Sequence, residues 1–140
     1  MPTAEAYRPF VEARAGGACE YCRLLQAPTG VTFHIEHRLP RSAGGRTVLD
    51  NLALSCPGCN LAKAHRTTGE DDQGRTQSLF NPRAYEPWLL GWHLHLRLNR
   101  RSGMIVPRSA VEEATVRALN MNAPTRVFAR RLQIRAGLIA

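Results

Sequence analysis

The sequence lacks any apolar stretch approaching the roughly 20 residues that a membrane-spanning helix requires. Residues 1–17 carry four charged side chains and no unbroken apolar run, so they do not have the pattern of a secretory signal peptide. Internal repeats and low-complexity tracts are also missing. From these absences we expect a soluble, cytoplasmic protein with no membrane partner.

Acidic residues and lysine are both scarce in this chain. Eleven acidic residues stand against 19 basic ones, and every basic residue except Lys63 is an arginine, which gives a net charge of +8 at pH 7. A surplus of this size favours a polyanionic partner, because basic contacts to phosphates release counterions. Arginine suits phosphate well, since its planar guanidinium donates two parallel hydrogen bonds. Charge alone leaves open whether the protein binds nucleic acid or is merely basic.

The length and composition predict one globular domain over residues 1–140, because 44% of the residues are hydrophobic and the chain is short. Within it we expect a core over about residues 16–67 and a C-terminal extension over about residues 79–140. The sequence contains no apolar stripe that would indicate dimerisation, so the oligomeric state stays open.

Apolar spacing and turn residues predict the elements of the first half. We expect a short helix over residues 3–14, strands over 31–38 and 52–55, and a helix over 57–66 that Pro57 begins. Residues 67–78 are polar and contain glycine, which predicts a loop.

The second half predicts a hairpin followed by two helices. Alternating leucines predict a strand over residues 92–98, which turns at Ser102-Gly103 into a partner over 104–106. Ser109 and Glu112 have the spacing of a capping box, which predicts a helix to about residue 121. A last helix is predicted over 124–138. It is strongly basic, and the pattern leaves open whether its arginines contact DNA or only solvate the helix.

The four cysteines form two matched pairs, Cys19-x-x-Cys22 and Cys56-x-x-Cys59, with 33 residues between them. In a reducing cytosol this arrangement indicates metal binding rather than disulfides. Two such pairs supply the four thiolates of a tetrahedral Zn²⁺ site, and four protein ligands leave no open position for substrate. We interpret the site as structural zinc. A redox pair or four unrelated buried thiols are the alternatives.

Further motifs lie between and just after these pairs. They are, in order, Glu36-His37, Pro40 with Gly44-Gly45, Asn51-Leu52, and Cys56-x-x-Cys59-Asn60-x-x-Lys63. This arrangement, covering roughly residues 19–63, resembles the HNH endonuclease family in its zinc-bearing form. The resemblance implies a small ββα-metal core stapled by a four-cysteine zinc site. Together with the N-terminal helix and the C-terminal hairpin plus two helices predicted above, this gives an expected α+β fold.

A weaker resemblance to one bacterial branch of that family continues downstream. It rests on residues 79–83 with Trp88, and on residues 114–116 and 119–122. The chain departs from that branch at Gly91-Trp92 and at Glu112-Glu113.

The resemblance assigns roles to individual positions. His37 is expected to be the general base, because an imidazole with a pKa near neutrality can take a proton from attacking water. Glu36 and Asn60 are expected to bind one catalytic divalent cation through oxygen, which suits Mg²⁺ or Mn²⁺. Asn51 is expected to hydrogen-bond the loop backbone and hold His37 in place. Adjacent positions on a strand predict that Glu36 and His37 point to opposite faces.

Three basic residues near these positions are expected to contact phosphates. Arg38 and Arg41 lie in the loop beside the base, and Lys63 lies one helical turn beyond Asn60. His34 and His65 remain further possible metal ligands.

The hypothesis that follows is a metal-dependent HNH endonuclease that hydrolyses phosphodiester bonds in DNA, with double-stranded DNA as the expected partner. The main alternative is a non-catalytic, zinc-dependent nucleic-acid-binding module. A zinc ribbon that binds proteins is a third possibility, and it predicts no salt-dependent affinity for DNA.

Overall fold

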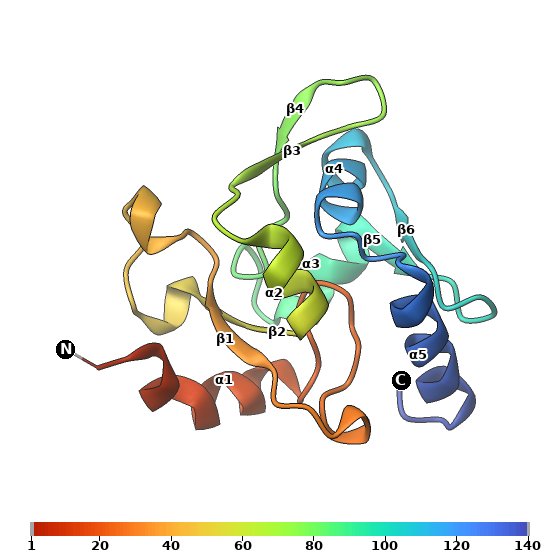
Figure 1. Cartoon of the computed structure of the whole chain (residues 1–140), viewed down its shortest axis with the longest axis horizontal. Helices are drawn as coiled ribbons and strands as arrows, with labels where there is room; N and C mark the ends of the chain where they lie inside the picture. The colour runs from red at the N-terminus through yellow and green to blue at the C-terminus, as the bar shows by residue number, and fades with distance from the viewer. Residues whose placement is uncertain (1, 140) are drawn as a thin grey trace.

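A computed structural model of the chain describes residues 2–139. Five α-helices lie within them (Figure 1): α1 (Arg8–Ala15), α2 (Pro57–Lys63), α3 (Trp88–His95), α4 (Ala110–Ala118) and α5 (Pro124–Arg135). The strands form three antiparallel pairs: β1 (His34–His37) with β2 (Leu52–Ser55), β3 (Thr68–Glu70) with β4 (Thr76–Ser78), and β5 (Leu96–Leu98) with β6 (Ile105–Pro107). Short 3-10 turns join them: η1 (Ala4–Tyr7), η2 (Ala27–Thr29), η3 (Arg41–Ala43) and η4 (Leu49–Asn51).

The segment between the cysteine pairs folds largely as its pattern predicts. β1 covers only the end of the expected strand, whereas β2 has the expected bounds, and the register pairs Glu36 with Ala53. α2 follows β2 directly. Pro57 occupies its first turn, and the Cys56 Sγ caps it by accepting a hydrogen bond from the Cys59 amide. This order places the second cysteine pair at the start of a helix that faces the strand pair.

The expectation of a strand over residues 92–98 is wrong for its first half. Those residues end helix α3, and only Leu96–Leu98 are extended, as β5. Trp88, Gly91 and Trp92 are buried with i, i+3, i+4 spacing, whereas Leu94 is 55% exposed. The helical period of the large buried groups therefore outweighs the alternation of the leucines.

The expectation of a loop over residues 67–78 is also incomplete, because β3 and β4 pair there. The hairpin packs on α4 at Gly69, where an added Cβ would lie 3.0 Å from the Ala114 carbonyl oxygen and from the Ala118 Cβ. A polar, glycine-containing sequence hides such a pair, because both of its strands expose their side chains.

The two C-terminal helices and the hairpin β5–β6 form as predicted, with shorter helices than expected. Ser109 does not cap α4 through its backbone amides. Its hydroxyl instead donates to the carboxylate of Glu112.

One apolar core connects these elements. Val11 of α1, Leu54 of β2, Trp92 of α3, Leu96 of β5 and Met121 after α4 are all fully buried in it, together with the four cysteines. In Figure 1, α1 lies below the β1–β2 pair, α2 lies at the centre, and α5 lies on the opposite side from α1. No helix within residues 2–139 is long and apolar enough to cross a membrane.

Candidate functional site

The four cysteine sulfurs converge at the centre of the molecule. The Sγ atoms of Cys19, Cys22, Cys56 and Cys59 lie within 4.8 Å of one another, and all four residues are buried. Within residues 2–139 no other group of three or more His, Cys, Asp or Glu side chains has this arrangement. The amides of Cys22 and Cys59 point at the sulfurs of Cys19 and Cys56, as in two turns that present thiolates to one ion. The cluster fits a zinc site.

Two of these four thiols ionise readily and two do not. Burial raises the pKa of Cys19 and of Cys59 well above 9.0, whereas hydrogen bonds from neighbouring thiols lower the pKa of Cys22 and Cys56. A metal must therefore displace protons from the two thiols that burial keeps neutral, so its affinity falls as the pH falls.

Arg126 of α5 extends the cysteine cluster towards the C-terminal helices. Its Nη1 donates a hydrogen bond to the Cys59 Sγ over 2.9 Å, and its Nη2 donates to the carbonyl oxygens of Leu119 and Asn120. A positive guanidinium beside four thiolates offsets their charge. The sequence gives no signal for this contact, which joins residues 67 positions apart.

A separate hollow of about 260 Å³ holds most of the candidate catalytic residues. It lies between β1, the loop around η3, and α2. The hollow is lined by Ile35, Glu36, His37, Pro40, Arg41, Ser42, Asn60, Ala64 and His65. Glu36 and His37 are adjacent on β1 and are expected from that spacing to point to opposite faces of the strand. Both nevertheless line this hollow, together with Asn60. His34 is exposed and lies outside this lining.

The carboxylate of Glu36 is buried, with 7% of its residue surface exposed. Its Oε1 accepts a hydrogen bond of 2.8 Å from the Tyr21 hydroxyl. Its Oε2 lies 3.1 Å from the Lys63 Nζ but accepts no well-directed hydrogen bond. Burial raises the pKa of Glu36 even though Lys63 and Tyr21 act in the other direction. Glu36 and Asn60 line the same hollow, and a carboxylate with an amide oxygen is a donor set that suits a hard divalent cation, which would share the Glu36 carboxylate with the Lys63 ammonium.

The side chain of Lys63, expected from the sequence to contact a phosphate, points into the protein. Its side chain is only 2% exposed, and its Nζ contacts the Glu36 carboxylate and the backbone oxygen of His37, at 3.1 and 3.3 Å. The ammonium therefore points inward at β1 and not towards solvent, where a phosphate would lie. Of the two loop arginines, Arg41 lines the hollow with His37, whereas Arg38 lines a separate small cavity with Lys63.

His37 is partly exposed, and its Nε2 lies 2.8 Å from the Thr47 hydroxyl. Burial lowers the pKa of His37 below 6.5, and the positive charges of Arg41 and Lys63 lower it further. The imidazole is therefore neutral at pH 7, as a proton acceptor must be.

Asn51 spans the loop that carries this histidine. Its Oδ1 accepts from the Leu39 amide at 2.9 Å, and its Nδ2 donates to the carbonyl oxygens of Leu39 and Arg46 at 3.0 and 2.9 Å. The loop closes so tightly that a Cβ on Gly45 would lie 1.8 Å from the Leu39 oxygen. Three hydrogen bonds from one amide thus hold both ends of the loop beside His37.

Two residues that hold Glu36 and His37 in place could not be predicted from the sequence. Thr47 contacts the histidine across ten residues of loop, and Tyr21 lies inside the first cysteine pair, yet neither belongs to a motif with a known spacing. Tyr21 is itself fixed, because its carbonyl oxygen accepts a hydrogen bond of 2.8 Å from the Trp92 Nε1.

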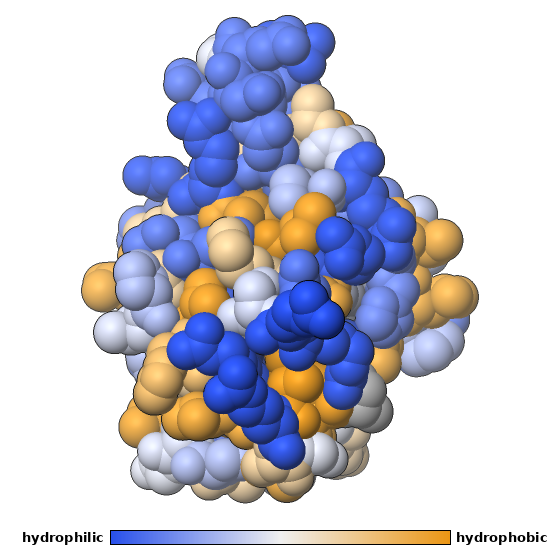
Figure 2. All heavy atoms as spheres, turned by 90° about the vertical axis from the view of Figure 1, so that its right-hand side faces the viewer, coloured by the Kyte–Doolittle hydropathy of each residue, from blue (hydrophilic) through white to orange (hydrophobic). Residues whose placement is uncertain are grey.

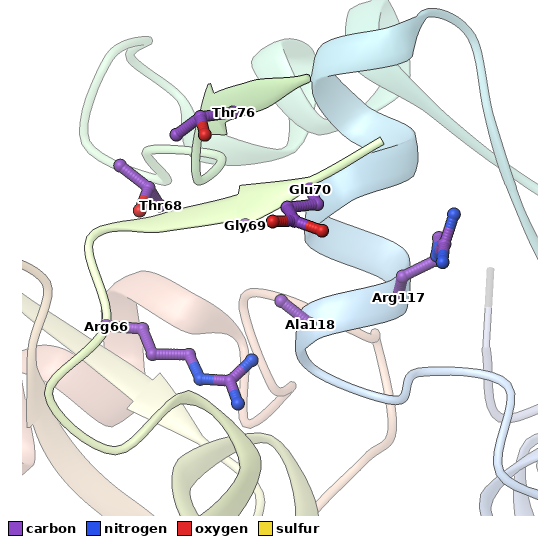
Figure 3. Close-up of a pocket in the computed structure, with 7 residues that line it drawn as sticks. All are labelled: Arg66, Thr68, Gly69, Glu70, Thr76, Arg117 and Ala118. Atoms are coloured by element: carbon purple, nitrogen blue, oxygen red, sulfur yellow. The ribbon is translucent and has the colours of Figure 1, made fainter. Parts of the chain in front are cut away.

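A larger hollow lies elsewhere on the surface (Figure 3). It measures about 480 Å³ and lies between β3, β4 and α4. Its lining consists of Arg66, Thr68, Gly69, Glu70, Thr76, Arg117 and Ala118. Its lining contains no histidine or cysteine and a single carboxylate, Glu70, so it offers no cluster of metal-ligating or acid–base groups, and size alone does not identify the site.

Comparison with known proteins favours the smaller hollow, which contains His37, as the functional site. The model of the family described as HNH endonuclease matches residues 19–66. The match contains both cysteine pairs, β1, β2, α2 and every residue of the His37 hollow, and it indicates nuclease-type activity or nucleic-acid binding with a zinc site. No curated protein and no solved structure matches the chain significantly.

We expect the purified protein to contain one zinc ion per chain, bound by four sulfurs at about 2.3 Å. Elemental analysis measures the zinc content per chain, and X-ray absorption at the zinc edge measures the ligand type and the zinc–sulfur distance. Removal of the ion by a chelator should lower the melting temperature, and the loss should occur more readily at lower pH, because protons compete for the thiols. Oxygen or nitrogen ligands in the absorption spectrum would contradict the four-sulfur site.

Replacing Asn51 by Ala should cost about 1–3 kcal/mol in the free energy of unfolding, because it leaves partly buried backbone groups of the loop without their side-chain partner. Asn122→Ala is a matched control, since Asn122 bridges the Ile105 amide and carbonyl far from this loop. Hydrogen exchange at the Leu39 amide should accelerate in Asn51→Ala and stay unchanged in Asn122→Ala. Equal Leu39 protection in both variants would show that Asn51 does not hold the loop.

Proposed function

We propose that this chain is a metal-dependent endonuclease of the HNH type, which hydrolyses phosphodiester bonds in DNA. The observation that carries the proposal is the convergence of Glu36, His37 and Asn60 on one hollow within the segment that matches the family. Arg41 on the rim adds a positive charge where a phosphate would enter.

His37 is the general base in this proposal. When Thr47 accepts a hydrogen bond from Nε2–H, the lone pair remains on Nδ1, which is the form that can take a proton from water. The lowered pKa keeps that lone pair free at neutral pH. Thr47 and Asn51 act as positioning residues, since one holds the ring and the other holds the loop beneath it.

Glu36 and Asn60 would hold the divalent cation. The bound ion supplies Lewis acidity, which stabilises negative charge on the phosphate and on the departing oxygen. The Glu36 carboxylate is kept in place by Tyr21, so its orientation does not depend on the ion. Lys63 positions the same strand by contacting the backbone oxygen of His37.

One contact favours a second candidate function, a nucleic-acid-binding module without cleavage. Lys63 already compensates the charge of Glu36, at 3.1 Å, so the carboxylate has a partner in the absence of a cation. Binding of DNA without cleavage under every divalent ion would favour this function.

The proposal is tested by incubating plasmid DNA with the protein and a panel of divalent ions. We expect nicking with Mg²⁺ or Mn²⁺, and we expect His37→Ala to lower the rate by about 10²–10⁴-fold, the usual contribution of a general base. His93→Ala is the matched control, because His93 is an exposed histidine of α3 outside the hollow. Equal rates for wild type and His37→Ala would refute the role of His37.

The pH dependence of cleavage provides an independent test. A general base works only while it is unprotonated, so a lowered pKa moves the loss of activity to lower pH. We expect kcat/KM to fall only below pH 6.5, the ordinary value for histidine, as His37 becomes protonated. Arg41→Gln removes a positive charge beside the ring and should move this acidic limb to higher pH. A limb at or above pH 6.5 in wild type, or one that Arg41→Gln leaves in place, would contradict the assignment.

A further inference from the structure

The positive charge of the chain is distributed very unevenly. Residues 1–86 carry ten basic and nine acidic side chains, a net charge of +1. Residues 87–140 carry nine arginines and two glutamates, a net charge of +7 out of the total of +8. Most of the surplus therefore lies outside the segment that matches the nuclease family.

The two glutamates do not neutralise the end of the molecule that contains α5. Both lie in α4, where Glu112 is buried against His95 and Ser109, and Glu113 lies 3.6 Å from Arg117 of the same helix. Neither the β5–β6 hairpin nor α5 contains an acidic residue.

The four arginines of α5 divide into two groups. Arg130 is fully buried and donates to the carbonyl oxygens of Gly103 and Met121, and Arg126 contacts the cysteine cluster. These two fasten the helix to the core. Arg135 is exposed on the outer face, and Arg131 beside it is half-buried with its Nε shielded from solvent. Neither makes an ion pair with any residue from 2 to 139.

The outer face of α5 also exposes apolar groups. Phe128 and Leu132 are 53% and 49% exposed, and the Arg131 guanidinium lies 5.5 Å from the centre of the Phe128 ring. Positions 128, 131, 132 and 135 share one side of a helix, because they follow i, i+3, i+4, i+7 spacing. Arginines and apolar groups thus alternate along a single stripe.

The turn of the β5–β6 hairpin adjoins this stripe. Gly103 approaches α5 so closely that a Cβ there would lie 2.7 Å from the Val127 oxygen and 3.2 Å from the Arg131 Cβ. The same turn carries the exposed Arg101. We name the outer face of α5 and this turn the basic face, defined by Arg101, Phe128, Arg131, Leu132 and Arg135. Figure 2 views the molecule from this side, and strongly hydrophilic groups gather there among hydrophobic ones.

We infer that the basic face is a second nucleic-acid contact, which binds the phosphate backbone outside the catalytic hollow. Unpaired arginines on a rigidly anchored helix bind phosphates without sequence preference, and the exposed apolar groups can contact sugars and bases. Phe128 and Leu132 also face outwards, so an anionic membrane is the competing occupant, and binding to anionic vesicles is measured to separate it from nucleic acid. The choice of nucleic acid as partner rests on the proposed function.

The two parts of the chain would then have different roles. The His37 hollow would act on one phosphodiester, whereas the basic face would supply much of the affinity for the strand, in a manner that depends on salt and not on sequence.

The experiment measures the affinity of His37→Ala protein for a short labelled DNA duplex over about 50–200 mM salt. The His37→Ala background removes cleavage without touching the basic face. Adding Arg131→Gln and Arg135→Gln should weaken binding and reduce the slope of log K against log salt by about 2, roughly one for each lost phosphate contact.

Ala6→Glu with Ala13→Glu is the charge-matched control, since it also lowers the net charge by two at exposed positions near and within α1, away from α5. This control should leave the slope unchanged. Arg131→Lys with Arg135→Lys should keep the slope, because lysine still contacts phosphate, and this variant shows that the surface rather than the fold is being tested. The zinc content and melting temperature of every variant are measured in parallel.

Three outcomes would overturn the inference. The first is an unchanged slope in the Gln variant, and the second is an equal decrease of the slope in the α1 control. The third is that the Gln variant loses binding to anionic vesicles while its binding to DNA is unchanged. Nicking by the wild type is measured separately. If the Gln variant loses its slope although the wild type cleaves nothing, the basic face stands and the nuclease proposal fails. If the wild type cleaves while the slope is unchanged, the reverse holds.

Discussion

The convergence of four buried sulfurs is the constraint on which the rest of the structure depends. The cluster joins the turn of residues 19–22 to the start of α2, and thereby closes the segment that contains β1, the His37 loop and β2. Through Arg126 it also holds α5. Burial disfavours ionisation of Cys19 and Cys59, so an ion that bound all four sulfurs would turn an unfavourable thiol cluster into a crosslink.

The candidate site is built on the same turn. Tyr21 lies between the first two cysteines and donates to Glu36, and Glu20 accepts a hydrogen bond from the Leu54 amide of β2 while pairing with Arg83. The turn that would bind zinc therefore also orients the carboxylate and one strand of the hollow. A structural metal in this position would act on the candidate site from a distance, because it would fix the turn that carries Tyr21 and Glu20.

The sequence predicted the parts of this arrangement whose spacing is set by chemistry. Two Cys-x-x-Cys turns must converge if one ion binds them. Pro57 predicts the start of α2, because proline is favoured in the first turn of a helix. The strand β2 and the helix α5 could also be predicted, because β2 consists largely of apolar residues and a proline begins α5. The match of residues 19–66 to the HNH family agrees with the motif order that suggested it.

The remaining features depend on contacts between distant residues. Leu94, Leu96 and Leu98 alternate like a strand, but the burial of Trp88 and Trp92 makes the first part of that segment helical. Lys63 has the spacing of a phosphate contact, yet the buried carboxylate of Glu36 draws its ammonium inward. Thr47 and Tyr21 support the site from positions that carry no motif. Local pattern cannot supply these contacts, since each arises from packing that forms only in the folded chain.

The central claim is that the sulfur cluster holds the His37 hollow in its working form. It is tested most directly by stripping the protein with a chelator, adding excess Mg²⁺ or Mn²⁺, and measuring plasmid nicking before and after stoichiometric zinc is restored. The account predicts that the stripped protein loses nicking, that the catalytic ion alone does not restore it, and that zinc does. Full nicking by zinc-free protein would contradict it.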